Sequence, residues 1–249
     1  GTVAIPGLGV STPFVVTAGA VTTVSILATA EVASSDLVEA KGIHVVAEDE
    51  VTVYGLSQAP QTTDAFLGLP TDVLGDEYVV LGYGNRAITP TPASQFGVVA
   101  TQDGTTVTIT PTEGTPGHPG GTPYTVPLDA GDTYQLRSPA VLTDLSGTTV
   151  TSDGGPIAVF GGHQCANVPP LFNSCNYLVE QLPSLLSISA VFASGAASAQ
   201  YETKQRVAIE IRFVLATGKG TWTLTPLTAG PLKKDSGTLV GTGVPKTPF

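Results

Sequence analysis

The feature that most constrains this chain is an internal repeat, in which four segments recur in the same order roughly one domain length further along. The matching pairs are 14–22 with 126–134, 42–55 with 147–161, 69–70 with 182–183, and 100–111 with 216–226. The separations lie between 106 residues (Gly55 to Gly161) and 115 residues (Pro111 to Pro226). A unit of this length is a domain rather than a short solenoid repeat. The repeat therefore predicts two lobes, residues 1–125 and 126–249.

Short apolar segments separated by turn residues run along the whole chain. The run Thr106-Val107-Thr108-Ile109-Thr110 alternates with the period of two that is typical of a half-buried strand. The 29 Gly and 20 Pro residues interrupt any longer pattern, and no extended 3.6-residue apolar stripe is present. The sequence therefore predicts an all-β protein made of two tandem, internally duplicated β-sandwich-like lobes packed together.

Several local elements can be predicted from turn chemistry. Residues 96–101 and 105–110 flank Gln102-Asp103-Gly104, which predicts a β-hairpin because Asp-Gly favours a tight turn. Tight turns are also expected at Ala18-Gly19 and at 129–132. Segments 64–74 and 178–186 have room for one short helical turn each, because Pro70 and Pro183 interrupt them.

Composition excludes several classes of partner. The net charge is −10 and the ten Lys and Arg residues are scattered, so a basic stripe for nucleic acid or an anionic membrane surface is not expected. No apolar run approaches the ~20 residues of a membrane-spanning helix. The low charged fraction of 12% fits either a neutral Thr-rich surface or a surface partly buried against other subunits. The chain starts at Gly1 and has no Met, so we expect a processed or excised chain.

Cys165 and Cys175 are the only cysteines and lie ten positions apart. A disulfide that closes this loop is the natural interpretation, and it points to an extracellular or cell-surface location, where disulfides persist. The bridge belongs to the second lobe alone, because the first lobe has no cysteine at the equivalent place. Polar residues of the loop form a candidate binding site: His163, Gln164, Asn167 and Asn173.

Catalytic and metal-binding patterns are not found. A zinc site needs four ligands, so His163 is expected to be a structural residue that hydrogen-bonds the loop. No Gly-x-Ser-x-Gly nucleophile motif occurs, and no glycine-rich loop is followed by a helix and a Lys. Asp64 and Glu180 precede equivalent Leu-Pro pairs, and each is interpreted as a turn-capping acid or as a glycan or calcium contact. We therefore expect no enzyme activity, metal or cofactor.

Two segments carry a family likeness. Residues 42–80 include Thr-Asp-Ala-Phe-Leu-Gly-Leu-Pro-Thr-Asp, and residues 157–183 include Gly-Gly-His-Gln-Cys-Ala-Asn-Val-Pro. Both resemble the IgGFc-binding protein N-terminal domain family, which is also widespread in large secreted bacterial proteins. The resemblance implies an extracellular, non-enzymatic module of adhesive or mucus-like proteins, without established catalytic residues. The chain departs from the family pattern after Pro183, where a Trp-Gly-containing strand is usual.

The two ends of the chain resemble each other, since Gly9-Val10-Ser11-Thr12-Pro13-Phe14 is similar to residues 243–249. The chain therefore stops where a third unit would begin, and its missing strand could come from residues 14–26 of another molecule by β-strand addition. The candidate assembly residues are Phe14, Val15, Val16, Val21, Val24, Ile26, Val244 and Phe249.

Three interpretations of function remain open. The first is a structural or adhesive module that self-assembles into a filament or coat, whose partners are other copies of itself. The second is that the chain is cut from a longer tandem array, whose adjoining repeats are its partners. The third is a soluble glycan- or glycoprotein-binding module of a larger secreted protein.

Overall fold

The computed structural model describes the backbone of residues 1–249 except 61, 85–93, 141, 169–173, 186–187, 194–195, 203–207, 215–217, 227–234 and 242–249, and it describes side chains up to residue 185. The chain divides into two compact units, Gly1–Pro183 and Ser184–Phe249. Each unit is built from antiparallel strands, and the described helical turns are three short 3-10 segments, Pro6–Leu8, Ala28–Ala30 and Thr71–Val73. The predicted all-β class is confirmed, and Thr71–Val73 supplies the expected turn beside Pro70.

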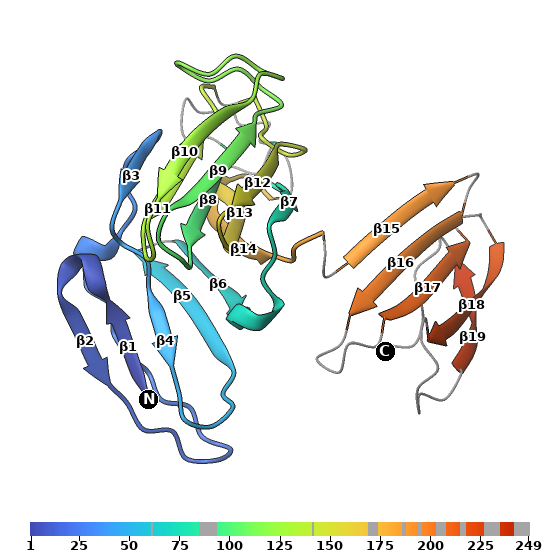
Figure 1. Cartoon of the computed structure of the whole chain (residues 1–249), viewed down its shortest axis with the longest axis horizontal. Coiled ribbons are helices and arrows are strands. Elements are labelled where there is room, and N and C mark those ends of the chain that lie inside the picture. Colours follow the sequence, from blue (N-terminus) through green and yellow to red (C-terminus); the bar gives the residue numbers. More distant parts are fainter. Residues whose placement is uncertain are drawn as a thin grey trace. The chain divides into compact units, whose positions relative to one another are not determined.

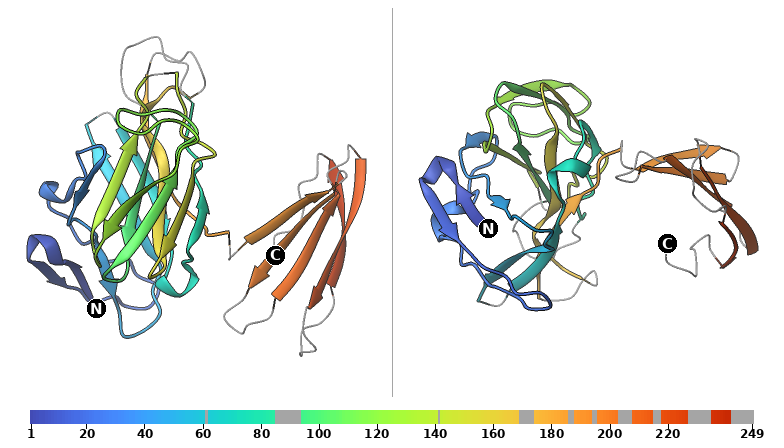
Figure 2. Two further views of the ribbon diagram at one scale, coloured as in Figure 1. Left: turned by 45° about the horizontal axis from the view of Figure 1, so that its top comes forward. Right: turned by 60° about the horizontal axis from the view of Figure 1, so that its bottom comes forward.

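The centre of the first unit is a β-sandwich made of two sheets (Figures 1 and 2). Sheet I has the strand order β10-β9-β12-β7, and sheet II has the order β14-β13-β8-β11-β3. The strands of sheet I are β7 Glu77–Val79, β9 Thr105–Thr110, β10 Tyr124–Leu128 and β12 Thr149–Asp153. The strands of sheet II are β3 Leu37–Glu39, β8 Ser94–Ala100, β11 Thr133–Arg137, β13 Ile157–Ala166 and β14 Asn176–Leu182.

One apolar core fills the space between the two sheets. Alternate residues of β8, β9, β10, β11 and β13 enter it, as expected for strands with one buried face. Its members include Phe96 and Val98 from β8, Val107 and Ile109 from β9, and Ile157 from β13, and each of these is at most 1% exposed. Because strands from β7 to β14 share this core, the two sheets form one body.

Strands β8 and β9 do not form the predicted hairpin. The two strands and the turn at Asp103-Gly104 are present, but β8 pairs with β11 and β13, whereas β9 pairs with β10 and β12. The turn is therefore an arch between sheet II and sheet I. The physical reason is that the apolar residues of both strands then face each other across the core. Strands β10 and β11, joined by the expected turn at 129–132, cross between the sheets in the same way.

Two smaller sheets belong to the same unit. Strands β1 (Thr2–Ile5), β2 (Val10–Pro13) and β4 (His44–Val46) form a sheet in the order β2-β1-β4. Strands β5 (Val53–Ala59) and β6 (Thr62–Gly68) form a hairpin that contacts β14. These elements are the blue to cyan part of Figure 1.

The second unit is a five-stranded antiparallel sheet in sequence order, β15-β16-β17-β18-β19. Its strands are β15 Ile188–Ala193, β16 Ala196–Glu202, β17 Ala208–Val214, β18 Gly218–Pro226 and β19 Asp235–Gly241. Each strand pairs with the next along the chain, so the unit is a simple meander.

The two duplicated lobes expected from the repeat are not confirmed. The expected boundary between residues 125 and 126 falls inside β10, and strands from both sides of it share the sandwich core. The chain instead divides after Pro183.

Candidate functional site

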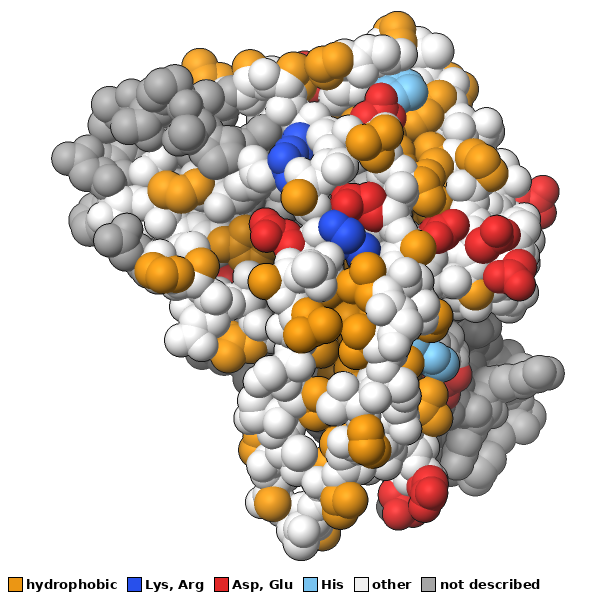
Figure 3. Space-filling model, turned by 90° about the vertical axis from the view of Figure 1, so that its left-hand side faces the viewer, with side chains coloured by type: hydrophobic (Ala, Val, Ile, Leu, Met, Phe, Trp, Pro, Cys, Tyr) orange, Lys and Arg blue, Asp and Glu red, His pale blue; other side chains and the backbone are white. Residues whose placement is uncertain are grey.

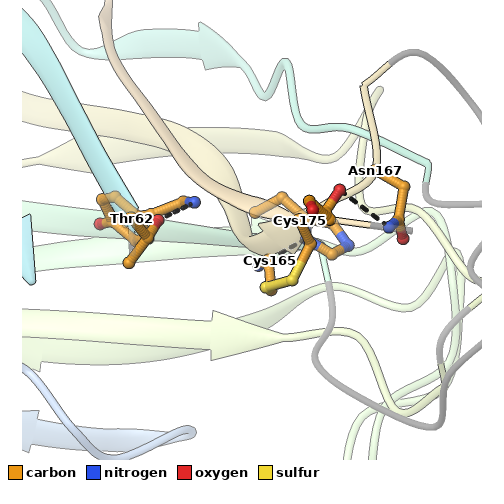
Figure 4. Close-up of a disulfide and its surroundings, with 7 residues drawn as sticks. Thr62, Cys165, Asn167 and Cys175 are labelled. Atoms are coloured by element: carbon orange, nitrogen blue, oxygen red, sulfur yellow. Dashed lines mark hydrogen bonds between the residues drawn. A yellow bond between two sulfur atoms is a disulfide. The ribbon is translucent and has the colours of Figure 1, made fainter. Parts of the chain in front are cut away.

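The loop between β13 and β14 is closed by a disulfide between Cys165 and Cys175, whose Cα atoms lie 4.9 Å apart (Figure 4). The predicted disulfide is therefore confirmed. The pairing of β13 with β14 shifts register between His163 and Ala166, so the bridge lies directly beside a bulge. Asn173, one of the four candidate binding residues, lies outside the described residues.

Asn167 ties the two ends of this loop together. Its Nδ2 donates to the carbonyl oxygen of Ser174 at 3.2 Å, and its own carbonyl oxygen accepts from Tyr83 Oη at 3.1 Å. The residue is 7% exposed. The fold itself therefore uses Asn167, as is usual for a buried amide.

His163 is fully buried, two residues before the disulfide-bonded Cys165. Its Nδ1 accepts the backbone N–H of Cys165 at 3.0 Å, so the neutral ring carries its proton on Nε2, which has no hydrogen-bond partner among the described residues. Burial lowers the pKa of His163, and the negative charge of Asp144 opposes this shift. The expected structural role of His163 agrees with the Cys165 contact.

Gly161 and Gly162 lie at two places where neighbouring backbone leaves no room for a side chain. The carbonyl oxygen of Leu81 lies where a Cβ on Gly161 would be, and the carbonyl oxygen of Leu178 lies in that place at Gly162. The Gly-Gly pair therefore allows backbone from two neighbouring segments to approach β13 closely.

Gln164 is turned toward β11. With its side-chain oxygen facing Arg137, that oxygen accepts from Nη1 at 3.3 Å and from Nε at 3.1 Å. Arg137 Nη2 in turn donates to the carbonyl oxygen of Ala33 at 2.7 Å. His163, Gln164 and Asn167 thus all contact the protein itself, while Val168 of the same loop is 55% exposed.

Side chains from β6 cap the outer edge of β14. Thr62 Oγ1 accepts the backbone N–H of Tyr177 at 2.7 Å (Figure 4), and Asp64 Oδ2 accepts that of Val179 at 2.8 Å. The ring of Phe66 meets Phe160 edge-on at 5.1 Å between centroids. Asp64 therefore caps a strand edge rather than a turn, and its repeat equivalent Glu180 is exposed on β14 itself.

A second polar cluster joins distant segments at the other edge of the sandwich. Asp36 Oδ1 accepts from Tyr134 Oη at 2.6 Å and lies 2.8 Å from His118 Nε2. Tyr124 Oη lies 2.8 Å from Tyr134 Oη, and the His118 ring stacks on Tyr124 at 3.5 Å between centroids. Asp36 has φ +62°, in the left-handed region that Asp tolerates better than most residues. Sequence reasoning missed this cluster, because its members have no common motif.

Buried surroundings also change the acidity of these tyrosines. Burial raises the pKa of Tyr124 to about 12, against a smaller opposing effect of the hydrogen bond to Tyr134. Burial, followed by the hydrogen bond to Asp36, raises the pKa of Tyr134 as well. Both phenols therefore stay protonated at neutral pH and serve as hydrogen-bond donors.

The expected assembly segment, residues 14–26, forms no strand. Phe14 is half-buried and pairs with Gly1 through two backbone hydrogen bonds of 3.0 Å, and the expected turn lies at 17–20. Val15 and Val21 are 83% and 93% exposed. Val16 and Ile26 are also exposed and Val24 is half-buried. Val244 and Phe249, the other candidate assembly residues, lie outside the described residues.

Exposed apolar side chains concentrate in the first third of the chain. Among the described residues, 18 large apolar side chains are exposed, and 14 of them belong to residues 8–67. Figure 3 shows apolar side chains gathered over the side of the molecule that carries β1 and β2. Such a concentration is typical of an interaction surface.

The β5–β6 hairpin contributes the most regular part of this surface. Tyr54 lies opposite Leu67, and Leu56 lies opposite Ala65, so all four share one face of the hairpin. Tyr54 is 72% exposed, Leu56 63% and Leu67 44%. We call these four residues the hairpin face.

The fold and the site define a class, namely an all-β protein whose main unit is a sandwich with a disulfide-closed loop and exposed apolar strands. The chain belongs to the IgGFc binding protein family, whose model matches residues 64–244. It is 32% identical over 166 residues to a human relative named IgGFc-binding protein. That match covers 64% of this chain and 3% of the relative, so the chain spans a small part of the relative's length.

Two further observations complete the comparison. No solved structure matches the chain. In the part of the chain that the structure describes, no helix is both long and apolar enough to cross a membrane.

Proposed function

We propose that this chain is a non-enzymatic, protein-binding module of a larger extracellular protein. The observation that carries the proposal is the concentration of exposed apolar side chains in residues 8–67, while the sandwich that supports them has a closed core. Surfaces of this kind mark protein interaction sites because their burial on binding is favourable.

The disulfide supports an extracellular location, and the name of the human relative suggests a ligand to test. The Cys165–Cys175 disulfide is of a kind that persists in oxidising compartments. The human relative, which is far longer than this chain, is named for binding the Fc part of IgG. An Fc fragment is therefore the first probe to test.

The experiment measures binding of human IgG Fc to the immobilised chain by biolayer interferometry, with Fab as the control ligand. The variant Tyr54→Ser/Leu56→Ser/Leu67→Ser removes the hairpin face, and we expect it to weaken Fc binding at least tenfold. Leu81→Ser/Leu142→Ser is the matched control, because these residues are 64% and 72% exposed on the sandwich. Equal loss in both variants, or no Fc binding by the unmodified chain, would contradict the proposed use of this surface for Fc.

A second candidate function is end-to-end self-assembly by strand addition of residues 14–26. It is favoured by Val15 and Val21, which are almost fully exposed in a segment that has no strand partner in the described part of the chain. Electron microscopy of the concentrated protein tests it, since filaments are expected for the unmodified chain and not for Val15→Ser/Val21→Ser. Single particles alone would contradict it.

Glycan or glycoprotein binding at the disulfide loop has less support. His163 and Asn167 are buried, and Gln164 contacts Arg137, so few polar groups of the described loop are free for a sugar. A glycan array tests this role, and a hit that survives Asn176→Ala/Ser174→Ala would place the glycan elsewhere.

A further inference from the structure

Strand β5 is the outer strand of its hairpin, and its free edge is unprotected. Strand β6 contacts β14, whereas β5 pairs only with β6 in the described part of the chain. One row of backbone N–H and C=O groups of β5 therefore points away from β6. Within the described residues, no backbone hydrogen bond from another element reaches this row. The strand also contains no charged residue and no proline, which are the usual devices that keep a partner from an edge.

The side chains beside this edge are apolar and exposed. Tyr54 and Leu56 share the outer face of the hairpin and are 72% and 63% exposed. Side chains of an added strand on that face would lie directly beside them, with Cβ atoms ~4.5–5.5 Å apart. Leu67 lies one strand further away, on β6, and would gain no such neighbour. The edge therefore favours a partner segment with an apolar side chain at every second position.

An acidic turn lies immediately before this strand. Glu48, Asp49 and Glu50 are all exposed, and none of them forms an ion pair within the described residues. Only two residues separate Glu50 from the start of β5 at Val53. A strand paired antiparallel with β5 would end beside this turn, so basic residues that follow such a strand would meet the three carboxylates.

The charge of the whole first unit also favours a basic partner. Residues 1–183 contain 3 Lys and Arg against 17 Asp and Glu, a net charge of −14. Lys41 already pairs with Glu39 at 2.6 Å, and Arg137 donates to the carbonyl oxygen of Ala33 at 2.7 Å. The third basic residue, Arg86, lies outside the described residues. A second copy of this acidic unit would be repelled at long range, whereas a cationic segment would be attracted.

We propose that the outer edge of β5 binds an extended segment of another protein by antiparallel strand addition. This segment has apolar side chains at alternate positions and basic residues after its last paired residue. Backbone hydrogen bonds hold such a segment, and its side chains provide specificity. The antiparallel direction matches that of β5 with β6 and is the more stable of the two per residue. This inference rests on the proposed protein-binding role and adds the mode of recognition and the charge of the partner.

A designed peptide tests the proposal against the full chain. In this peptide Val and Thr alternate over seven positions, the length of β5, and three Lys follow. Fluorescence anisotropy of the labelled peptide should show saturable binding in low salt, and about 0.5 M NaCl should weaken it because the Debye length shortens. A peptide with Glu in place of Lys should not bind. Failure of the Lys peptide to bind would overturn the proposal, while Fc binding measured separately could still support the protein-binding role.

Backbone methylation of the peptide tests strand addition itself. Successive residues of an added strand direct their N–H groups alternately toward β5 and away from it. One peptide is therefore N-methylated on its Val residues and another on its Thr residues. One of the two should lose binding and the other should retain it. Retention by both, or loss by both, would exclude strand addition as the mode of binding.

Neutralising the turn tests the charge complementarity. Glu48→Gln/Asp49→Asn/Glu50→Gln should weaken peptide binding about tenfold in low salt, as expected for three exposed ion pairs. Glu77→Gln/Glu113→Gln/Asp153→Asn is the matched control, because it removes the same charge from exposed residues of β7, β12 and the loop after β9. It should bind almost as the unmodified chain does. Equal weakening in both variants would show that net charge alone acts.

Two single variants separate the edge of β5 from the hairpin face as a whole. Leu56→Thr should weaken peptide binding about three- to fivefold, the range of a cross-strand contact, and Leu67→Thr should leave it unchanged. Equal loss in both would mean that the peptide covers the face, which contradicts the proposal. Sedimentation velocity of the chain alone adds a further check, since a dimer that Leu56→Thr abolishes would assign the edge to a second copy instead.

Discussion

Asp64 Oδ2 accepts the backbone N–H of Val179 at 2.8 Å, and so a side chain of one hairpin replaces the strand partner that an edge strand otherwise needs. Together with the neighbouring contact of Thr62, this bond holds the β5–β6 hairpin on the sandwich. The position of the hairpin face on the sandwich therefore depends on these hydrogen bonds from Thr62 and Asp64.

Asp64→Ala should destabilise the protein by about 1–3 kcal/mol, because it leaves the Val179 N–H without its acceptor in a partly buried place. Urea unfolding measures the loss. Asp64→Asn keeps a side-chain oxygen at the same position and should lose less. Equal stability of Asp64→Ala and the unmodified chain would show that the contact contributes nothing.

The disulfide closes a short loop and should contribute roughly 2–3 kcal/mol, chiefly by restricting the unfolded chain. Cys165→Ser/Cys175→Ser should therefore lower the free energy of unfolding by this amount. Dithiothreitol should lower the stability of the unmodified chain to a similar extent and leave the double variant unchanged. Sensitivity of the double variant to the reductant would point to another cause.

His163 should make stability depend on pH. Burial lowers the pKa of His163 from the ordinary 6.5, so below that value the unfolded chain binds a proton that the folded chain resists. The contribution is fully present above pH 6.5 and is lost as the pH falls from there through the folded pKa. The urea midpoint should therefore fall between pH 7.5 and pH 5.

His163→Gln should show a flatter pH profile over the same range, even if it is less stable throughout. His44→Gln is the control, because His44 is exposed and its substitution should leave the profile of the unmodified chain intact. A profile that His163→Gln does not change would assign the pH dependence to other groups.

Tyr134→Phe should cost about 1.5–3 kcal/mol, because the lost hydroxyl donates to the carboxylate of Asp36 in a buried place. Asp36→Ala should cost more than Asp36→Asn, since Asn retains an acceptor and tolerates the left-handed backbone that Ala disfavours. Thermal unfolding ranks the three variants. Asp36→Ala as stable as Asp36→Asn would mean that neither factor matters.

Gly162→Ala should prevent the native pairing of β13 with β14, because the carbonyl oxygen of Leu178 occupies the place of the new methyl group. Gly97→Ala on the adjacent strand is the control, since its nearest neighbour would be Tyr134 O at 3.8 Å, an ordinary contact. Soluble expression and circular dichroism compare the two. Normal folding of Gly162→Ala would require the backbone of β14 to move.

Local patterns predicted the local structure well. Alternating residues identified β9, and the lone pair of cysteines identified the disulfide. The pairing of strands was harder to predict, because the turn at Asp103-Gly104 is compatible both with a hairpin and with an arch. The choice depends on which partner buries Phe96 and Val107, and that partner is far away in the sequence.

The candidate site shows the same limit. The sequence predicts His163 and Gln164 of the Gly-Gly-His-Gln-Cys string as ligand contacts, but the structure turns both side chains toward the protein. The cluster around Asp36 joins residues up to 98 positions apart, so no short motif could reveal it. Exposure of the hairpin face likewise depends on what the fold leaves uncovered rather than on the strand pattern itself.

The capping of β14 by Thr62 and Asp64 also bears on resistance to aggregation. A bare edge strand is a template on which unfolded or neighbouring chains can build amyloid-like sheets. Here the hairpin blocks that template with two side chains and without extending the sheet. Local detachment of β5–β6, without global unfolding, would thus expose the edge of β14 and allow the protein to seed aggregation.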